Sequence, residues 1–257
     1  MFELSANLEL MFTEAGVDAG ARCRAAAEQG IKYVEIWDWR NKDLVSLAAA
    51  LQETGTVLQT MCTIPMGRLV DPSTHEEFLL GLRESIPVAE RLGSPFLVVT
   101  AGDELTGMGR QDQHNAVVAA LRAAVPILEG HEVVLLLENL NSRVDHAGTF
   151  LDSTTEVIEI LREVDSPQVR LLYDLYHSLV MTEDAATVLR GNLDVLGHIQ
   201  IADVPGRGEI GTGTIDWAAQ LAELRALGYT GRLGMELIPT VETVKSLRAI
   251  SALAVAV

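Results

Sequence analysis

The sequence predicts a single (β/α)8 barrel, and three observations lead to this fold. The chain has 257 residues, close to the roughly 250 of a typical barrel. Eight short apolar segments occur along it, and longer amphipathic segments separate them. Most of the apolar segments are nearly continuous in hydrophobic residues, as are parallel strands that are covered on both faces. The expected strands are 2–8, 33–37, 57–63, 96–102, 133–140, 169–176, 196–203 and 233–239.

Helical segments follow the expected strands in order. Several end at a glycine, where a helix C-cap is expected, and Asn41, Asp152 and Asp216 are placed as N-caps. Eight such units with right-handed crossovers close into a barrel, and no linker divides residues 1–257. An open doubly wound sheet is the alternative, but no Gly-x-Gly-x-x-Gly follows the first strand. The expected helices are 18–29, 42–54, 75–92, 112–129, 154–164, 183–193, 217–227 and 241–254.

The composition excludes several classes of partner. The formal net charge is −17, and an acidic surface repels phosphate backbones and anionic headgroups, so we expect no nucleic-acid or membrane partner. No signal peptide is evident, and no segment approaches the ~20 apolar residues that span a bilayer. Two cysteines are too few for a disulfide framework, which fits a reducing compartment. We expect a cytoplasmic protein with a small-molecule substrate. The composition is compatible with either a monomer or a homo-oligomer.

Polar side chains interrupt the expected strands in the second half of the chain. Barrel active sites lie at the C-terminal ends of the strands, and strands five to eight each carry an oxygen-bearing side chain there. One carboxylate inside a buried strand is costly unless it is paired or bound to a metal. Four such side chains at equivalent depth would converge on one point. They are Glu138, Asp174, Gln200 and Glu236.

These four side chains together favour a divalent cation. Three carboxylates crowded at one point repel one another unless a cation neutralises them. Oxygen ligands suit Mg2+ or Mn2+, whereas zinc usually recruits more nitrogen or sulfur. The sequence therefore predicts one divalent ion, Mg2+ or Mn2+, with a buried polar network without metal as the alternative.

Two further residues are candidates for substrate binding. His177 lies three residues after Asp174, and Arg207 lies in the segment PGRGEIGTG, whose glycines allow a loop to fold closely over a site. An arginine there can hold a substrate carboxylate or hydroxyl. The alternatives are a structural loop histidine and a solvent-exposed arginine.

Other conspicuous residues have structural interpretations. His198 is expected to be a core polar residue or to lie below the metal, since it shares a strand face with Gln200. Trp37 and Trp39 either wall the pocket or pack beneath a helix. Cys62 has no evident basic activator, so we expect no nucleophilic role.

The sequence resembles the hydroxypyruvate isomerase family, within the xylose isomerase-like TIM barrel superfamily. The matching segments are FELSANLELMF, LLLENLN, LLYDLYH, GHIQIADVPGRGEIGTGTIDW and LGMELIP. The resemblance implies that Glu138, Asp174, Gln200 and Glu236 hold one divalent metal and that the two glutamates are the acid–base pair. It also implies that His177 hydrogen-bonds a substrate oxygen. Related ketose 3-epimerases generally place a histidine where Gln200 stands, which favours the hydroxypyruvate isomerase branch.

The activity implied by the resemblance is aldose–ketose isomerisation of a small hydroxy-carbonyl compound through an enediolate. Epimerisation next to the ketone of a sugar or sugar acid is the first alternative, because it uses the same metal and glutamate pair. Dehydration of an inositol-like ketone and a non-catalytic sugar-binding role are others. Phosphodiester cleavage, as in endonuclease IV-like relatives, needs a histidine-rich multi-zinc site and a basic face, which six histidines and a net charge of −17 disfavour.

The first half of the chain departs from the family. The second strand leads into VEIWDWRNKD rather than an aromatic-proline segment, and the loop after the third strand, MCTIPMGRLVDPS, is short. The fifth-strand motif is Glu-Asn rather than Glu-Pro. Because these loops shape the pocket, the sequence leaves the substrate open.

Overall fold

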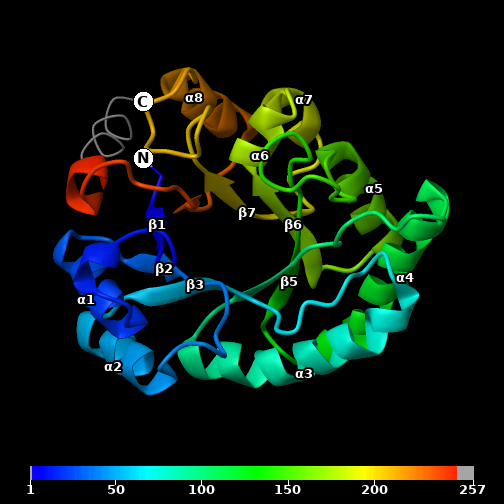
Figure 1. The fold of residues 1–257 in the computed structure, drawn as a ribbon, viewed down its shortest axis with the longest axis horizontal. Coiled ribbons are helices and arrows are strands. Elements are labelled where there is room, and N and C mark those ends of the chain that lie inside the picture. Colours follow the sequence, from blue (N-terminus) through cyan, green and yellow to red (C-terminus); the bar gives the residue numbers. More distant parts are fainter. Residues whose placement is uncertain (1, 248–257) are drawn as a thin grey trace.

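The computed structural model describes residues 2–247 and forms a closed barrel of parallel strands in sequential order. The eighth strand pairs with the first, so the sheet has no free edge. This confirms the predicted (β/α)8 barrel and excludes the open sheet (Figure 1). Within the described residues the strands are β1 (Leu4–Asn7), β2 (Tyr33–Glu35), β3 (Val57–Cys62), β4 (Phe96–Val99), β5 (Val134–Glu138), β6 (Val169–Asp174), β7 (Leu196–Ile201) and β8 (Leu233–Met235).

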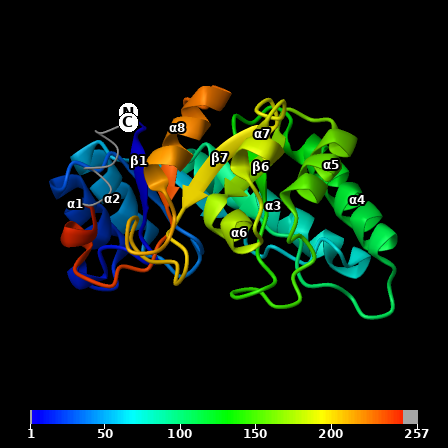
Figure 2. The ribbon, with the colours of Figure 1, turned by 90° about the horizontal axis from the view of Figure 1, so that it is seen from above.

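The helices form an outer layer around the strands (Figure 1). Turned by 90°, the view shows the loops that follow β5 and β7 on one side of the barrel (Figure 2). Two short 3-10 helices, η1 (Thr13–Ala15) and η2 (Pro72–Thr74), lie in loops. The α-helices that lie wholly within residues 2–247 are α1 (Ala19–Glu28), α2 (Leu44–Thr54), α3 (His75–Leu92), α4 (Arg110–Leu128), α5 (Thr154–Val164), α6 (Leu175–Val180), α7 (Ala185–Leu189) and α8 (Trp217–Leu227).

The region after β6 differs from the prediction. The expected strand 169–176 ends at Asp174, because Leu175 already begins α6, and the Asp174 carboxylate caps that helix by accepting from the His177 backbone N–H at 3.2 Å. The expected helix 183–193 is reduced to the short α7. An apolar run does not by itself distinguish the end of a strand from the start of a helix. Of the expected helix 241–254, residues 243–247 are helical, and the remainder from 248 on lies outside the described residues.

Two of the three predicted helix N-caps are wrong. Asp216 caps α8 as expected. The cap of α2 is Asp43 rather than Asn41, and Asp152 accepts a hydrogen bond from the Ser142 hydroxyl instead of capping α5. The glycine C-caps are confirmed where the left-handed backbone conformation favours glycine, at Gly55, Gly93 and Gly228.

The apolar core is divided by the wall of the barrel. Leu137, Tyr173 and Ile199 belong to a large cluster that includes the buried faces of the helices, whereas Leu136 and Leu172 form a separate small cluster with two other strand residues. Successive strand residues point to opposite faces. The small cluster therefore fills part of the barrel interior, and each fully buried leucine contributes roughly 1.5–3 kcal/mol by leaving water.

Candidate active site

The barrel gathers the four predicted ligand residues at one end. Glu138 and Asp174 are the last residues of β5 and β6, Gln200 is the penultimate residue of β7, and Glu236 directly follows β8. Asp174 and Gln200 are paired in register. Glu138 lies two residues beyond Leu136, and Asp174 two beyond Leu172, so these side chains share the interior face.

A cavity of about 240 Å³ opens at this end of the barrel. Its lining is mostly apolar with a few charged groups, the usual character of a small-molecule site. The residues come from the ends of β3 and β5, from α6, and from the segments after β2, β3, β4, β5, β7 and β8. They are Trp37, Cys62, Met66, Thr100, Glu138, Leu140, His146, His177, Arg207 and Glu236.

Three of the four predicted ligand residues present a buried oxygen that accepts no hydrogen bond from any described residue. These atoms are Asp174 Oδ2, Gln200 Oε1 and Glu236 Oε2. A buried oxygen that accepts no hydrogen bond is costly, and of these three Glu236 Oε2 has an ion-pair partner at 3.1 Å, Arg207. Unsatisfied oxygens from successive strands are what a hard cation requires. This set of ligand oxygens therefore fits a divalent metal ion.

His177 lies closer to the carboxylates than the sequence indicated. Glu138, Asp174 and His177 each offer one possible ligand atom, and these three atoms lie within 4.8 Å of one another. His177 Nε2 is 3.5 Å from Asp174 Oδ2 and 4.0 Å from Glu138 Oε1, and it too lacks a hydrogen-bond partner among the described residues. The other ring nitrogen, Nδ1, is 2.6 Å from the Asn141 side-chain nitrogen. His177 therefore presents Nε2 to the site, either to a substrate or to a metal.

Arg207 places a positive charge within this acidic cluster. Its Nη2 lies 3.1 Å from Glu236 Oε2 and 3.8 Å from Asp174 Oδ2, and its guanidinium stands over the Tyr176 ring at 5.4 Å. The backbone of Arg207 has a positive φ of 54°, and its carbonyl accepts from the Ile238 N–H at 2.7 Å. The loop after β7 is thus fixed against the end of β8. Arg207 is only 14% exposed, so it is no ordinary solvent-facing loop arginine.

Burial and like charges shift the titration of the two glutamates. Burial, followed by the charges of Glu236 and Asp174, raises the pKa of Glu138 well above its ordinary value. Burial is also the main cause that raises the pKa of Glu236 to about 8, although the charge of Arg207 opposes it. Burial lowers the pKa of His177, which favours its neutral form. A divalent cation would reverse the shifts of the glutamates by stabilising their charged forms.

Two side chains from the first half of the barrel hold Glu236. The Trp37 indole N–H and the Asn7 side-chain amide both donate to Glu236 Oε1, the latter at 3.2 Å. This leaves Oε2 directed into the site. The pocket interpretation of Trp37 is therefore supported. Trp39 instead donates to the Ser85 hydroxyl on α3 at 3.1 Å, which matches packing beneath a helix.

Asn139 fastens the end of β5 to the end of β6. Its side-chain oxygen accepts from the Asp174 N–H at 2.9 Å, and its amide donates to the Asp174 carbonyl at 3.1 Å and to the Ser178 hydroxyl at 3.2 Å. A proline at this position could make none of these side-chain bonds. The departure from the Glu-Pro motif therefore gives this chain a direct link between Glu138 and Asp174.

Sequence reasoning missed Glu35, at the end of β2. It is fully buried and contacts His198 Nε2 at 2.8 Å and the Gln200 side-chain amide at 2.9 Å. Burial acts to raise the pKa of Glu35, but the His198 charge and the hydrogen bonds from His198 and Gln200 keep this pKa below its ordinary value. The signal in the sequence was the same as for Glu138, a glutamate that interrupts an apolar run. His198 is a buried interior residue, as expected.

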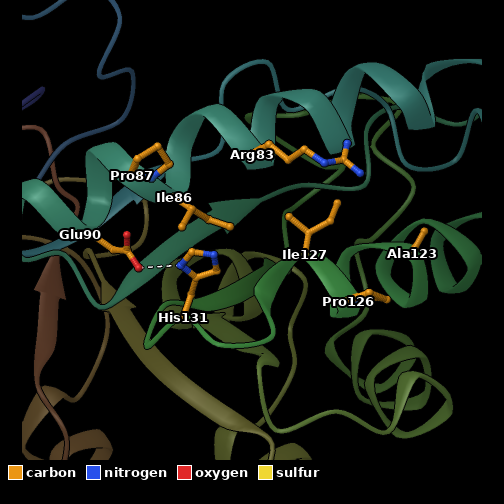
Figure 3. A pocket seen from close by; sticks show the side chains of 8 residues that line it. All are labelled: Arg83, Ile86, Pro87, Glu90, Ala123, Pro126, Ile127 and His131. Atoms are coloured by element: carbon orange, nitrogen blue, oxygen red, sulfur yellow. Dashed lines mark hydrogen bonds and ion pairs between the residues drawn. The ribbon is translucent and has the colours of Figure 1, made fainter.

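Two further features, Cys62 and a hollow between α3 and α4, are not part of the carboxylate cluster. Burial strongly raises the pKa of the Cys62 thiol, which agrees with the expectation of no nucleophilic role. A hollow of about 610 Å³ lies between α3 and α4 (Figure 3), where the Glu90–His131 pair at 2.7 Å is accompanied by Pro87, Pro126 and apolar side chains. This hollow lies on the helical layer, and none of its lining residues comes from the C-terminal end of a strand.

Comparisons with known proteins agree with this architecture. The chain belongs to the xylose isomerase-like TIM barrel family, whose model matches residues 23–253. It is 32% identical to the putative hydroxypyruvate isomerase of Homo sapiens over 95% of this chain and 92% of that one. It is 29% identical to the hydroxypyruvate isomerase of Escherichia coli (strain K12), over 96% and 98%. These matches confirm the family and the prediction of an isomerase.

A solved structure extends the comparison to three dimensions. The AP endonuclease, family 2, from Brucella melitensis has a TM-score of 0.90 and 26% identity, covering 98% of this chain and 99% of that one. The fold is therefore shared along nearly the whole chain.

Proposed function

We propose that this chain is a metal-dependent isomerase of a small hydroxy-carbonyl acid, of the hydroxypyruvate isomerase type. The observation that carries the proposal is the set of buried oxygens that accept no hydrogen bond, Asp174 Oδ2, Gln200 Oε1 and Glu236 Oε2, the last of which forms an ion pair with Arg207 at 3.1 Å. Together with Glu138 they provide an all-oxygen site suited to Mg2+ or Mn2+. When bound, the ion would polarise the carbonyl and the adjacent hydroxyl of the substrate.

Glu138 and Glu236 are the proposed acid–base pair. They project from β5 and from the end of β8 and line the same cavity, so they can flank a substrate within it. One glutamate takes the carbon-bound proton and the other delivers a proton to the neighbouring carbon, through an enediolate. Asn7 and Trp37 hold one oxygen of Glu236. Within the described residues the ion-pair contact of the Glu138 carboxylate is His177 Nε2, at 4.0 Å.

Arg207 is the proposed anchor for a substrate carboxylate. It is the arginine that lines the cavity, and arginine–carboxylate pairs are among the stronger hydrogen-bonded contacts in proteins. The hydroxypyruvate of the relatives' names carries such a group. His177 is proposed to hydrogen-bond a substrate oxygen through Nε2.

The two buried free cysteines are consistent with the proposed cytoplasmic location.

Phosphodiester cleavage is not favoured, despite the name of the Brucella melitensis protein. Such chemistry calls for several zinc ions and mostly histidine ligands, whereas the candidate metal group among the described residues holds a single histidine, His177. Described residues contain no helix long and apolar enough to cross a membrane. A small-molecule substrate fits a cavity of about 240 Å³.

The proposal is tested by turnover of hydroxypyruvate, pentuloses, hexuloses and an inosose with Mn2+ present. Isomerisation of hydroxypyruvate, abolished by EDTA and restored by Mn2+, supports it. Epimerisation of a ketose in its place would assign the chain to the epimerases. In D2O, deuterium at the accepting carbon supports the enediolate, whereas complete retention of the substrate hydrogen favours a direct hydride shift.

A further inference from the structure

The proposed mechanism assigns no role to Glu35. It is fully buried in the barrel interior, yet both of its oxygens are engaged. Oε1 contacts His198 Nε2 at 2.8 Å, and Oε2 accepts from Gln200 Nε2 at 2.9 Å. Because β2 and β7 are not neighbours in the barrel, this side chain crosses the interior to reach β7.

The part of the barrel wall between β2 and β7 makes room for this crossing. Gly234 on β8 is paired in register with Gln200. A Cβ atom at Gly234 would lie 2.4 Å from Glu35 Oε1 and 2.9 Å from His198 Nε2. Any larger residue at this position would therefore displace the glutamate. The local sequence LGMELIP thus accommodates both Glu236 and the side chain of Glu35.

We propose that Glu35 is a positioning residue that fixes the amide orientation of Gln200, so that Oε1 rather than Nε2 faces the metal centre. A glutamine amide has an acceptor end and a donor end of nearly equal size, and rotation by 180° exchanges them. In the exchanged orientation an NH2 group would face the cation, and one ligand would be lost.

The surrounding contacts select one orientation. The Glu35 carboxylate accepts hydrogen bonds, so it favours the NH2 end of the Gln200 amide on its side. The other end, Gln200 Oε1, is then directed away from Glu35 and is buried without a donor. His198 holds the second oxygen of Glu35 and thereby fixes the carboxylate. This inference rests on the proposed metal site and adds the residue that prepares one of its ligands.

Glu35→Gln tests the role with Mn2+ binding as the readout, measured by calorimetric titration of the metal-free chain. The substitution keeps the size of the side chain but offers either amide end to Gln200. We expect Mn2+ affinity to fall roughly 10–100-fold, the usual effect of removing a group that orients a metal ligand. The matched control is Glu209→Gln, because Glu209 is also a buried glutamate and accepts from the Thr240 and Val241 backbone. The control should bind Mn2+ as the wild type does.

A reciprocal exchange separates orientation from general packing. In the double variant Glu35→Gln/Gln200→Glu, the amide at position 35 can donate to the carboxylate at position 200, whose other oxygen still faces the centre. We expect this variant to regain most of the affinity lost in Glu35→Gln. In Gln200→Glu alone, two carboxylates meet, and we expect no such gain. Purely additive effects of the two substitutions would contradict the proposed orientation.

The outcomes distinguish this inference from the proposed function. A wild-type chain that binds no Mn2+ would overturn the metal site and the inference with it. Wild-type affinity in Glu35→Gln would overturn the inference alone. If Glu35→Gln is too unstable to purify, Glu35→Asp serves in its place, because it keeps a carboxylate for His198 and withdraws it from Gln200.

Discussion

At the scale of single residues, the site concentrates groups whose charges oppose one another. Glu138, Asp174 and Glu236 converge with one guanidinium, that of Arg207, in contact with two of them. Burial raises the pKa of both glutamates in the metal-free protein. Perturbed titration of groups that line a cavity is typical of functional sites. The residue-scale predictions therefore concern what each of these groups does.

Glu138→Gln and Glu236→Gln are each expected to lower kcat at least about a hundredfold, since positioned acid–base groups contribute roughly 10²–10⁴. The double variant should lose much less than the product of the two effects, because the residues act as one unit. Steady-state kinetics with Mn2+ at saturation measures this. Full activity in either variant would remove that glutamate from the mechanism.

Arg207→Ala is expected to raise KM roughly 10–100-fold for carboxylate substrates, with a smaller effect on neutral ketoses. A charge-assisted hydrogen bond contributes about 1.5–3 kcal/mol, which corresponds to that change. Metal content should remain normal. Arg143→Ala, in an exposed part of the loop after β5, is the control. An unchanged KM across the substrate panel would reject the anchoring role.

His177→Ala distinguishes a substrate contact from a metal ligand. If Nε2 binds the substrate, KM should rise while the bound Mn2+ per chain, measured by elemental analysis after dialysis, stays the same. Loss of the ion would instead assign His177 to the ligand set with Glu138 and Asp174, the group that it approaches in the structure.

At the scale of elements, the ends of neighbouring strands are joined by side chains rather than by further ladder bonds. Asn139 makes three hydrogen bonds to β6 and α6 just beyond the end of β5. Glu209 joins the loop after β7 to the segment after β8 through Thr240 and Val241. The Asn139 bonds support Asp174, one of the proposed ligands, whereas the Glu209 bonds join two loop segments outside the ligand set.

Asn139→Ala is expected to lower the free energy of unfolding by roughly 1–3 kcal/mol, because the buried N–H of Asp174 loses its Asn139 acceptor and the Asp174 carbonyl loses one donor. Mn2+ affinity should also fall, since Asp174 loses its support. Asn115→Ala, at an exposed position of α4, should change stability by no more than about 0.5 kcal/mol. Equal effects of the two substitutions in urea titrations would contradict this role.

At the scale of the whole molecule, the raised pKa of Glu236 couples folding to pH. In the metal-free protein the pKa of Glu236 is about 8, against an ordinary value of 4.5. Between these values the unfolded chain binds fewer protons than the folded one. The contribution of Glu236 to stability therefore falls as the pH rises from about 4.5 to about 8.

Mn2+ should accordingly stabilise the fold more at pH 8 than at pH 6. At the lower pH the ion must first displace protons from the glutamates. At a concentration of 100 times Kd, a bound ion adds about 2.7 kcal/mol. Thermal unfolding with and without Mn2+ at both pH values measures the difference, and Glu236→Gln should lose most of it. A larger shift at pH 6 would contradict the prediction.

The sequence by itself determined the barrel and predicted polar residues that the fold brings to one end of it. Continuous apolar runs predicted the eight strands, because a parallel strand that is covered on both faces consists almost entirely of apolar residues. Polar residues at the ends of those runs then pointed to Glu138, Asp174, Gln200 and Glu236. The boundary after β6 could not be predicted, because Leu175 and Tyr176 are as apolar in a helix as in a strand.

Only the tertiary structure decided which side chains meet across the barrel. Glu35 and Gln200 are 165 residues apart in the chain, and Trp37 and Glu236 are 199 apart. Closure of the sheet determines such contacts, and no local periodicity encodes them. The same holds for Arg207, whose place among the carboxylates depends on the loop after β7 packing against the end of β8. Residue type and strand position could be predicted because they follow from local patterns of burial, whereas partners within the interior follow from the closed geometry of the barrel.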